Sequence, residues 1–90
     1  MATSIQEMLK AGARVVDVRT AEEYVDGHYH SAVNIPVAEL AGRLAELGAK
    51  TDSLIVYCAS GARSAAAARL LKTSGFVDVV NAGGLADMPR

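Results

Sequence analysis

Apolar positions along the chain recur with two different spacings, which separate the predicted helices from the predicted strands. Segments 4–10 and 20–26 each begin with a serine or threonine and carry a glutamate three residues later, the pattern of a capped helix start. Segment 37–47 has apolar residues at helical spacing, which predicts an amphipathic α-helix. The alanine-rich segment 63–74 predicts a further helix, ended by Gly75.

Short apolar runs lie between these helices, at residues 14–18, 32–35, 54–58 and 76–80. Their length and their β-branched residues predict strands. Strands that alternate with helices through short loops predict an α/β fold with a largely parallel sheet. In such a sheet the functional crevice lies at the carboxyl ends of the strands.

Composition narrows the class of protein. The chain of 90 residues predicts one domain over residues 1–90, and a hydrophobic content of 51% is enough for a compact core. A net charge of −1 argues against nucleic acid or an anionic membrane as a partner. No apolar run is long enough to span a bilayer, and the amino-terminal residues lack the pattern of a signal peptide. A single cysteine excludes an internal disulfide and fits a reducing compartment, so we expect a cytoplasmic protein.

The single cysteine stands where a predicted strand meets a predicted helix. The apolar run 54–58 ends at Cys58, and the residues of the loop and helix start follow: Ala59, Ser60, Gly61, Ala62, Arg63 and Ser64. Backbone N–H groups of such a loop, together with the helix dipole, form a pocket for an anion. The same field lowers a thiol pKa from about 8.5 to roughly 3.5–7.5. We therefore expect Cys58 to be a reactive thiolate; the alternative for a lone cysteine at a strand end is an inert buried residue.

The segment Cys58-Ala59-Ser60-Gly61-Ala62-Arg63-Ser64 resembles the Cys-x-x-Gly-x-Arg-Ser active-site loop of single-domain rhodaneses. Further landmarks of that family stand in the same order along the chain: Asp17-Val18-Arg19, Glu22-Glu23-Tyr24, Gly27-His28, Asn34-Ile35-Pro36 and Gly83-Gly84. The resemblance therefore covers about Val15 to Gly84. It implies a three-layer α/β/α rhodanese-like domain around a small, largely parallel sheet.

The resemblance also implies a sulfurtransferase. In that family the cysteine thiolate takes the outer sulfur of a donor such as thiosulfate, becomes a persulfide, and passes the sulfur to cyanide or to a thiol. Cys58 would be the nucleophile and sulfur carrier, and the backbone of Ala59, Ser60, Gly61, Ala62, Arg63 and Ser64 would bind its charge. The partners are a small-molecule donor and acceptor, or a protein thiol. No cofactor and no metal is implied.

Two side chains of the loop leave alternative roles open. Arg63 either holds an anionic donor or turns away to brace the loop against a carboxylate, and we favour bracing or a mixed role. The Ser64 hydroxyl either donates a hydrogen bond within the site or caps the helix, and we favour capping.

Other functions are also open. The first is a protein-to-protein sulfur relay or a regulatory binding module, in which activity on thiosulfate is incidental. A phosphatase or arsenate reductase fits less well, because four residues separate Cys58 from Arg63 and the loop of cysteine-dependent phosphatases is one residue longer. A catalytically dead interaction domain is disfavoured because Cys58 is present.

Asp17 and Arg19 lie at the end of the first predicted strand, on the same sheet edge as Cys58. We interpret them as architectural, and we expect Arg19 to pair with Glu22 or Glu23.

His28 and His30 form a His-x-His pair, but no further ligand cluster accompanies them, so we expect a backbone contact for His28 and no metal site. Two positions depart from the family pattern. Tyr29 stands where the family has an aliphatic residue, and it either lines the site or packs on the surface. Met88 stands near a position where the family often has tryptophan.

Overall fold

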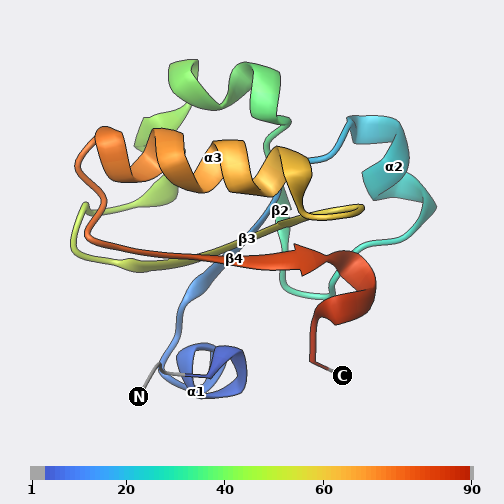
Figure 1. The fold of residues 1–90 in the computed structure, drawn as a ribbon, viewed down its shortest axis with the longest axis horizontal. Coiled ribbons are helices and arrows are strands. Elements are labelled where there is room, and N and C mark those ends of the chain that lie inside the picture. Colours follow the sequence, from blue (N-terminus) through green and yellow to red (C-terminus); the bar gives the residue numbers. More distant parts are fainter. Residues whose placement is uncertain (1–3, 90) are drawn as a thin grey trace.

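A parallel sheet of four strands forms the centre of the computed structural model, which describes residues 4–89 (Figure 1). The strands are β1 (Arg14–Asp17), β2 (Val33–Asn34), β3 (Ser53–Cys58) and β4 (Asp78–Gly84). They lie in the order β2-β1-β3-β4, and each neighbouring pair is parallel. The predicted α/β fold with a parallel sheet is confirmed.

Helices connect the strands and cover both faces of the sheet. The α-helices of the described residues are α1 (Ile5–Lys10), α2 (Ala21–Asp26) and α3 (Ala62–Thr73), and the 3-10 helices are η1 (Val37–Gly42), η2 (Leu44–Leu47) and η3 (Leu85–Asp87). Both of the predicted capping boxes are present: Ser4 pairs with Glu7 at the start of α1, and Thr20 pairs with Glu23 at the start of α2. These local signals start the two short helices at the residues that the sequence predicts.

Successive residues of β3 point to opposite faces of the sheet, and each face has its own core. Leu54, Val56 and Cys58 pack in the cluster that α3, η1 and η2 cover. Ile55 and Tyr57 pack in the cluster that α1 and η3 cover. Figure 1 shows α3 and the green 3-10 segments above the sheet, and α1 with the carboxyl-terminal segment below it. The sheet is therefore the middle of three layers, and a strand buried on both faces is apolar throughout.

The amphipathic α-helix predicted over residues 37–47 is wrong, because the segment forms two 3-10 helices separated at Arg43. Gly42 has a low helix propensity, and the backbone of Arg43 leaves the helical region at φ −127°. The apolar pattern still predicts burial correctly, since Leu40 and Leu47 are fully buried. A 3-10 helix rises about 2.0 Å per residue against about 1.5 Å for an α-helix, so the segment reaches further along the sheet toward β3.

The fourth strand lies later in the chain than predicted. We expect it at residues 76–80 with a loop after it, but β4 runs from Asp78 to Gly84. Phe76 is a buried loop residue whose backbone N–H donates to the carbonyl of Leu71. The final residues of β4 are small or polar, and they extend the strand because they pair with β3 and not because of their own strand propensity.

The expected pairing of Arg19 with Glu22 or Glu23 is wrong, because Arg19 pairs with Asp17. The Arg19 Nε donates to Asp17 Oδ1 at 2.9 Å and Nη2 donates to Asp17 Oδ2 at 2.6 Å. Nη2 also donates to the carbonyl of Gly27 at 2.7 Å. Asp17 has no exposed surface, so its buried charge requires a cation beside it. Arg19, two residues later in the chain, provides that cation.

The same carboxylate joins β1 to β3 and to the loop after α2. The Tyr57 hydroxyl donates to Asp17 Oδ2 at 2.7 Å and accepts from the backbone N–H of Tyr29 at 2.9 Å. Tyr29 therefore lies against the second core cluster, where its side chain is partly buried. This hydrogen-bonded network fixes the carboxyl ends of the two central strands relative to each other.

Arg19→Ala is expected to lower the free energy of unfolding by about 3–5 kcal/mol, because it leaves the buried charge of Asp17 without its partner. Urea denaturation at neutral pH measures the change. Arg43→Ala is the matched control: the ion pairs of Arg43 with Glu39 and Glu46 are exposed, so its removal should cost less than about 1 kcal/mol. Equal losses in the two variants would contradict the role given to the buried pair.

Candidate active site

The turn between β3 and α3 places Cys58 at the carboxyl edge of the sheet. Cys58 is the last residue of β3, and α3 begins four residues later at Ala62. Gly61 is the N-cap of α3 and has a φ of 101°, a left-handed conformation that favours glycine. The chain can therefore reverse within a few residues and bring the first N–H groups of α3 back over the sulfur.

Backbone amides of this turn converge on the sulfur of Cys58. The N–H of Gly61 donates to Sγ over a distance of 3.0 Å, and the N–H of Ser64 donates to Sγ over 3.4 Å. Both groups lie at the positive end of the α3 dipole, where an anion is stabilised. Cys58 itself has no exposed surface, so the sulfur lies beneath the loop.

The Ser64 hydroxyl takes part in this site and does not cap the helix, so the favoured capping role is wrong. Ser64 lies inside the first turn of α3, whose N-cap is Gly61. Its Oγ lies 3.4 Å from Cys58 Sγ and 2.6 Å from Asn81 Oδ1. Asn81 also donates from Nδ2 to the carbonyl of Gly61, so β4 holds both the hydroxyl and the turn.

The pKa of the Cys58 thiol is lowered to about 7. Burial acts in the opposite direction and raises this pKa, because it disfavours the charged form. Hydrogen bonds from the side chain and backbone of Ser64 and from the backbones of Gly61 and Ser60 outweigh the burial. A thiol with a pKa of about 7 is present in part as the thiolate near neutral pH.

Arg63 is turned toward α2, where it forms an ion pair with Glu23. Its Nη1 donates to Glu23 Oε1 at 2.7 Å and its Nη2 donates to Oε2 at 3.0 Å. The pKa of Arg63 is raised, first by these hydrogen bonds and further by the negative charges of Glu23 and Cys58, against a lowering effect of burial. Arg63 thus makes the carboxylate contact of the bracing role, while it remains close enough to Cys58 to interact with its charge.

The carboxyl end of β4 closes the other side of the turn. A Cβ atom added to Gly84 would lie 2.3 Å from the carbonyl oxygen of Ala59, a distance that no side chain can occupy. Gly84 pairs with Cys58 in the sheet, so glycine at this position lets the loop lie directly on the strand.

The predicted loop residues are thus gathered around one sulfur atom, but they contribute unequally. Gly61 and Ser64 contact the sulfur through their amides, whereas Ala59, Ser60 and Ala62 are exposed with small side chains. The sequence does not predict that Asn81 takes part in the site, because Asn81 lies beyond the strand predicted over residues 76–80. A polar residue at the carboxyl end of a parallel strand is the signal that could have indicated it.

Glu23 is the second residue whose part in the site the sequence does not predict. The capping-box pattern explains Glu23 only as part of the start of α2, and the expected partner of Arg19 was either Glu22 or Glu23. The ion pair with Arg63 joins α2 to the first turn of α3, forty residues later in the chain.

The two histidine rings of the loop after α2 each lie against a tyrosine, His28 against Tyr24 and His30 against Tyr29. His28 Nδ1 lies 2.8 Å from the carbonyl oxygen of Tyr24, which is the expected backbone contact, and its ring stacks on Tyr24. Within residues 4–89 no group of three or more His, Cys, Asp or Glu is arranged to hold a metal ion. Among the helices that the structure describes, none has the length and apolar character needed to cross a membrane.

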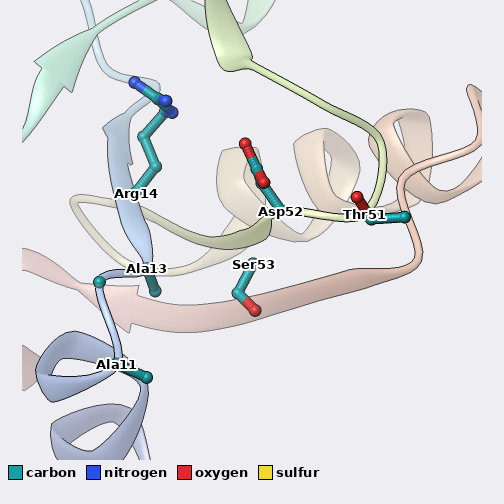
Figure 2. A pocket seen from close by; sticks show the side chains of 7 residues that line it. Ala11, Ala13, Arg14, Thr51, Asp52 and Ser53 are labelled. Atoms are coloured by element: carbon teal, nitrogen blue, oxygen red, sulfur yellow. The ribbon is translucent and has the colours of Figure 1, made fainter.

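A separate hollow of about 340 Å³ lies at the opposite, amino-terminal edge of β1 and β3. Figure 2 shows that the side chains of Arg14 and Asp52 extend from its rim away from α1. Two of its polar side chains are engaged locally: Asp52 accepts from the N–H of Ala49, and the Ser53 hydroxyl donates to Asp78. It holds no nucleophile or charge cluster comparable with the turn at Cys58.

The chain is similar in sequence and in structure to proteins that contain a rhodanese-like domain. A family model of the rhodanese-like domain matches residues 1–87. Thiosulfate sulfurtransferase PspE of Escherichia coli is 41% identical over 78 residues, which are 83% of this chain and 75% of that protein. "Putative sulfur carrier protein YrkF" of Bacillus subtilis is 42% identical over 67 residues, but these are 74% of this chain and only 36% of that protein. A rhodanese from E. coli, solved with anions, superimposes with a TM-score of 0.81 at 38% identity, over 86% of this chain and 92% of that one.

The thiolate absorbance of Cys58, followed in the ultraviolet, is expected to appear with a midpoint near pH 7, with Cys58→Ser as the blank. Ser64→Ala should move this midpoint to higher pH, because it removes a hydrogen bond that stabilises the thiolate, and the thiolate fraction at pH 7 should fall. An unchanged midpoint would show that the hydroxyl proton is given to Asn81 and not to the sulfur.

Gly84→Ala is expected to lower the free energy of unfolding by about 1–3 kcal/mol and to raise the pKa of Cys58, because the new methyl group displaces the loop that covers the sulfur. Urea denaturation and thiolate absorbance measure the two effects. Gly42→Ala is the matched control, since a Cβ atom there meets nothing within 4 Å. If Gly84→Ala behaved like Gly42→Ala, the close contact with Ala59 would not constrain the site.

Proposed function

This chain belongs to the rhodanese-like domain family, and on that basis we propose that it is a sulfurtransferase that carries sulfur as a persulfide on Cys58. One observation supports the proposal above the others. The amides of Gly61 and Ser64 both donate to a single sulfur atom at the start of a helix. This arrangement stabilises a negative charge on sulfur before and after transfer.

The donor step is a displacement at sulfur. With thiosulfate, the Cys58 thiolate attacks the outer sulfur, a new S–S bond forms, and the S–S bond of thiosulfate breaks so that sulfite leaves with the bonding electron pair. The enzyme retains one sulfur as a Cys58 persulfide, and the total charge is unchanged. Cyanide then attacks the outer persulfide sulfur, leaves as thiocyanate, and returns Cys58 to the thiolate.

The size of the cradle favours transfer of sulfur over transfer of a phosphoryl group. The Gly61 amide reaches Sγ itself at 3.0 Å, so the turn is closed around one atom. A phosphatase needs the corresponding amides to bind the oxygens of a tetrahedral group that lies beyond the sulfur. The closed turn around Sγ supports sulfur transfer over phosphoryl transfer, the same preference that the length of the loop between Cys58 and Arg63 indicates.

The buried position of Cys58 implies that the loop shifts during the reaction. Because Cys58 has no exposed surface, a donor atom reaches Sγ only when the segment above it moves. Ala59 and Ser60 form the exposed part of that segment, and their small side chains present little steric barrier to such a shift. The amides that move aside for the donor are then available to the outer sulfur of the persulfide.

A sulfur-relay role is the second candidate, in which the donor or acceptor is a protein thiol. The observation that favours it is the likeness to YrkF, which is named as a sulfur carrier. The two functions use the same persulfide and differ in the molecule that delivers the sulfur.

Incubation with thiosulfate is expected to add the mass of one sulfur atom to the protein, and addition of cyanide should remove it and release thiocyanate. Intact-protein mass spectrometry and a colorimetric thiocyanate assay measure the two steps. Cys58→Ser should show neither, because it lacks the nucleophile. Uptake of sulfur only from a persulfidated protein would favour the relay, and hydrolysis of phosphate esters without any sulfur uptake would contradict both functions.

A further inference from the structure

The cations at the carboxyl edge of the sheet are paired with carboxylates. Arg19 is bound by the buried carboxylate of Asp17, and Arg63 is bound by Glu23 through two short hydrogen bonds. The loop residues Ala59 to Ala62 carry no charge. A donor that approaches Cys58 therefore meets backbone amides and a neutral ion pair, and not a free guanidinium group.

Glu23 is well suited to hold Arg63 in place because it is itself fixed. Its Oε1 accepts from the backbone N–H of Thr20 at 3.0 Å and from the Thr20 hydroxyl at 3.1 Å, which are the bonds of the α2 capping box. The pKa of Glu23 is lowered to about 2, first by the hydrogen bond from Arg63 and then by that from Thr20. The carboxylate is thus charged at every pH at which Cys58 titrates.

Charge then distinguishes between two classes of sulfur donor. Thiosulfate is a dianion, and the sulfite it releases is also an anion, so its binding depends on uncompensated positive charge near the sulfur. An organic persulfide, R–S–SH, is neutral when protonated and presents only one charge when ionised. The amides at Gly61 and Ser64 bind the reacting sulfur in both cases.

We infer that Glu23 determines the donor preference of this site: by neutralising Arg63 it favours a persulfide of an organic thiol over thiosulfate. The inference rests on the proposed function and names its substrate class. In the favoured step the Cys58 thiolate attacks the outer sulfur of R–S–SH, the S–S bond of the donor breaks, and R–S⁻ leaves with the electron pair. The transferred sulfur keeps its hydrogen, so Cys58 becomes Cys58–S–SH and the total charge stays at −1. Glu23 acts through Arg63 and is a positioning residue.

Glu23→Gln is the direct test, because the amide oxygen of glutamine can still cap α2 while the negative charge on Arg63 is removed. Single-turnover sulfur uptake by Cys58 is measured by quenched-flow mass spectrometry with thiosulfate and, separately, with 2-hydroxyethyl persulfide, whose organic group carries no charge. The wild-type protein should prefer 2-hydroxyethyl persulfide. In Glu23→Gln the second-order rate constant for thiosulfate should rise about three- to tenfold relative to that for the persulfide, the effect expected of one partly exposed charge.

Two further readouts distinguish electrostatics from a general disturbance of the fold. The gain with thiosulfate should come from a lower half-saturating concentration and not from a higher maximal rate, and it should shrink as ionic strength rises. The double variant Glu23→Gln with Arg63→Gln should lose the gain, because the freed guanidinium is its source.

Glu22→Gln is the matched control, since it removes the same charge from the same helix without touching Arg63; its donor ratio should equal that of the wild type. Arg63→Gln should shift the ratio the other way, against thiosulfate, because Glu23 is then left uncompensated beside the site. If Glu23→Gln does not fold, the donor ratio of Arg63→Gln still tests the inference.

An unchanged donor ratio in both Glu23→Gln and Arg63→Gln would overturn the inference, as would a wild-type protein that prefers thiosulfate. In either case the proposed sulfurtransferase function would stand. Absence of sulfur uptake from both donors in the wild type would instead contradict the proposed function itself.

Discussion

The hydrogen bonds that two backbone amides donate to the sulfur of Cys58 are the interaction on which the rest of the site depends. They require a strand that ends at the sulfur, a reversal of the chain at Gly61, and a helix whose first turn lies directly above the strand. Each requirement fixes part of the surrounding structure. β4 must bring a residue without a side chain to Ala59, and Asn81 must hold the hydroxyl of Ser64 beside the sulfur. Glycine at positions 61 and 84 thus allows the turn to close over the sulfur.

Two ion pairs organise the edge of the sheet around this cradle, and they differ in environment. The Asp17–Arg19 pair is buried, and together with Tyr57 it fixes the ends of β1 and β3. The Glu23–Arg63 pair is about two-thirds buried and connects α2 to the start of α3. Each pair takes one partner, Arg19 or Glu23, from the segment between β1 and β2, so this segment supports the turn over Cys58 from outside the sheet. A buried pair contributes to the specificity of the fold, whereas a partly exposed pair close to the Cys58 sulfur also sets the local charge at the surface beside it.

Local signals in the sequence predict a large part of this arrangement. Capping boxes at Ser4 and Thr20 place two helices correctly, and the apolar run that ends at Cys58 correctly predicts a central strand. These features depend on neighbours within a few residues, which is why they can be interpreted without the fold. The errors arise where distant neighbours decide the structure. The segment around Arg43 becomes 3-10 helices, although its apolar spacing is helical, and β4 extends through residues that pair with β3 without strand propensity of their own.

The sequence by itself determined the order of the elements, the position of Cys58 at the end of a strand, and the turn of small residues that follows it, because each depends on residue types at short spacing. Only the tertiary structure decided the partners of the charged and polar side chains. Arg63 binds Glu23, Arg19 binds Asp17, and Ser64 binds Asn81, and in two of these three pairs the partners lie far apart along the chain. Several carboxylates were available to each arginine at the level of sequence, and the packing of α2 and β4 around the end of β3 selected among them. The arrangement of charges around Cys58 is therefore a property of the fold, whereas the cysteine at this position is specified by the sequence.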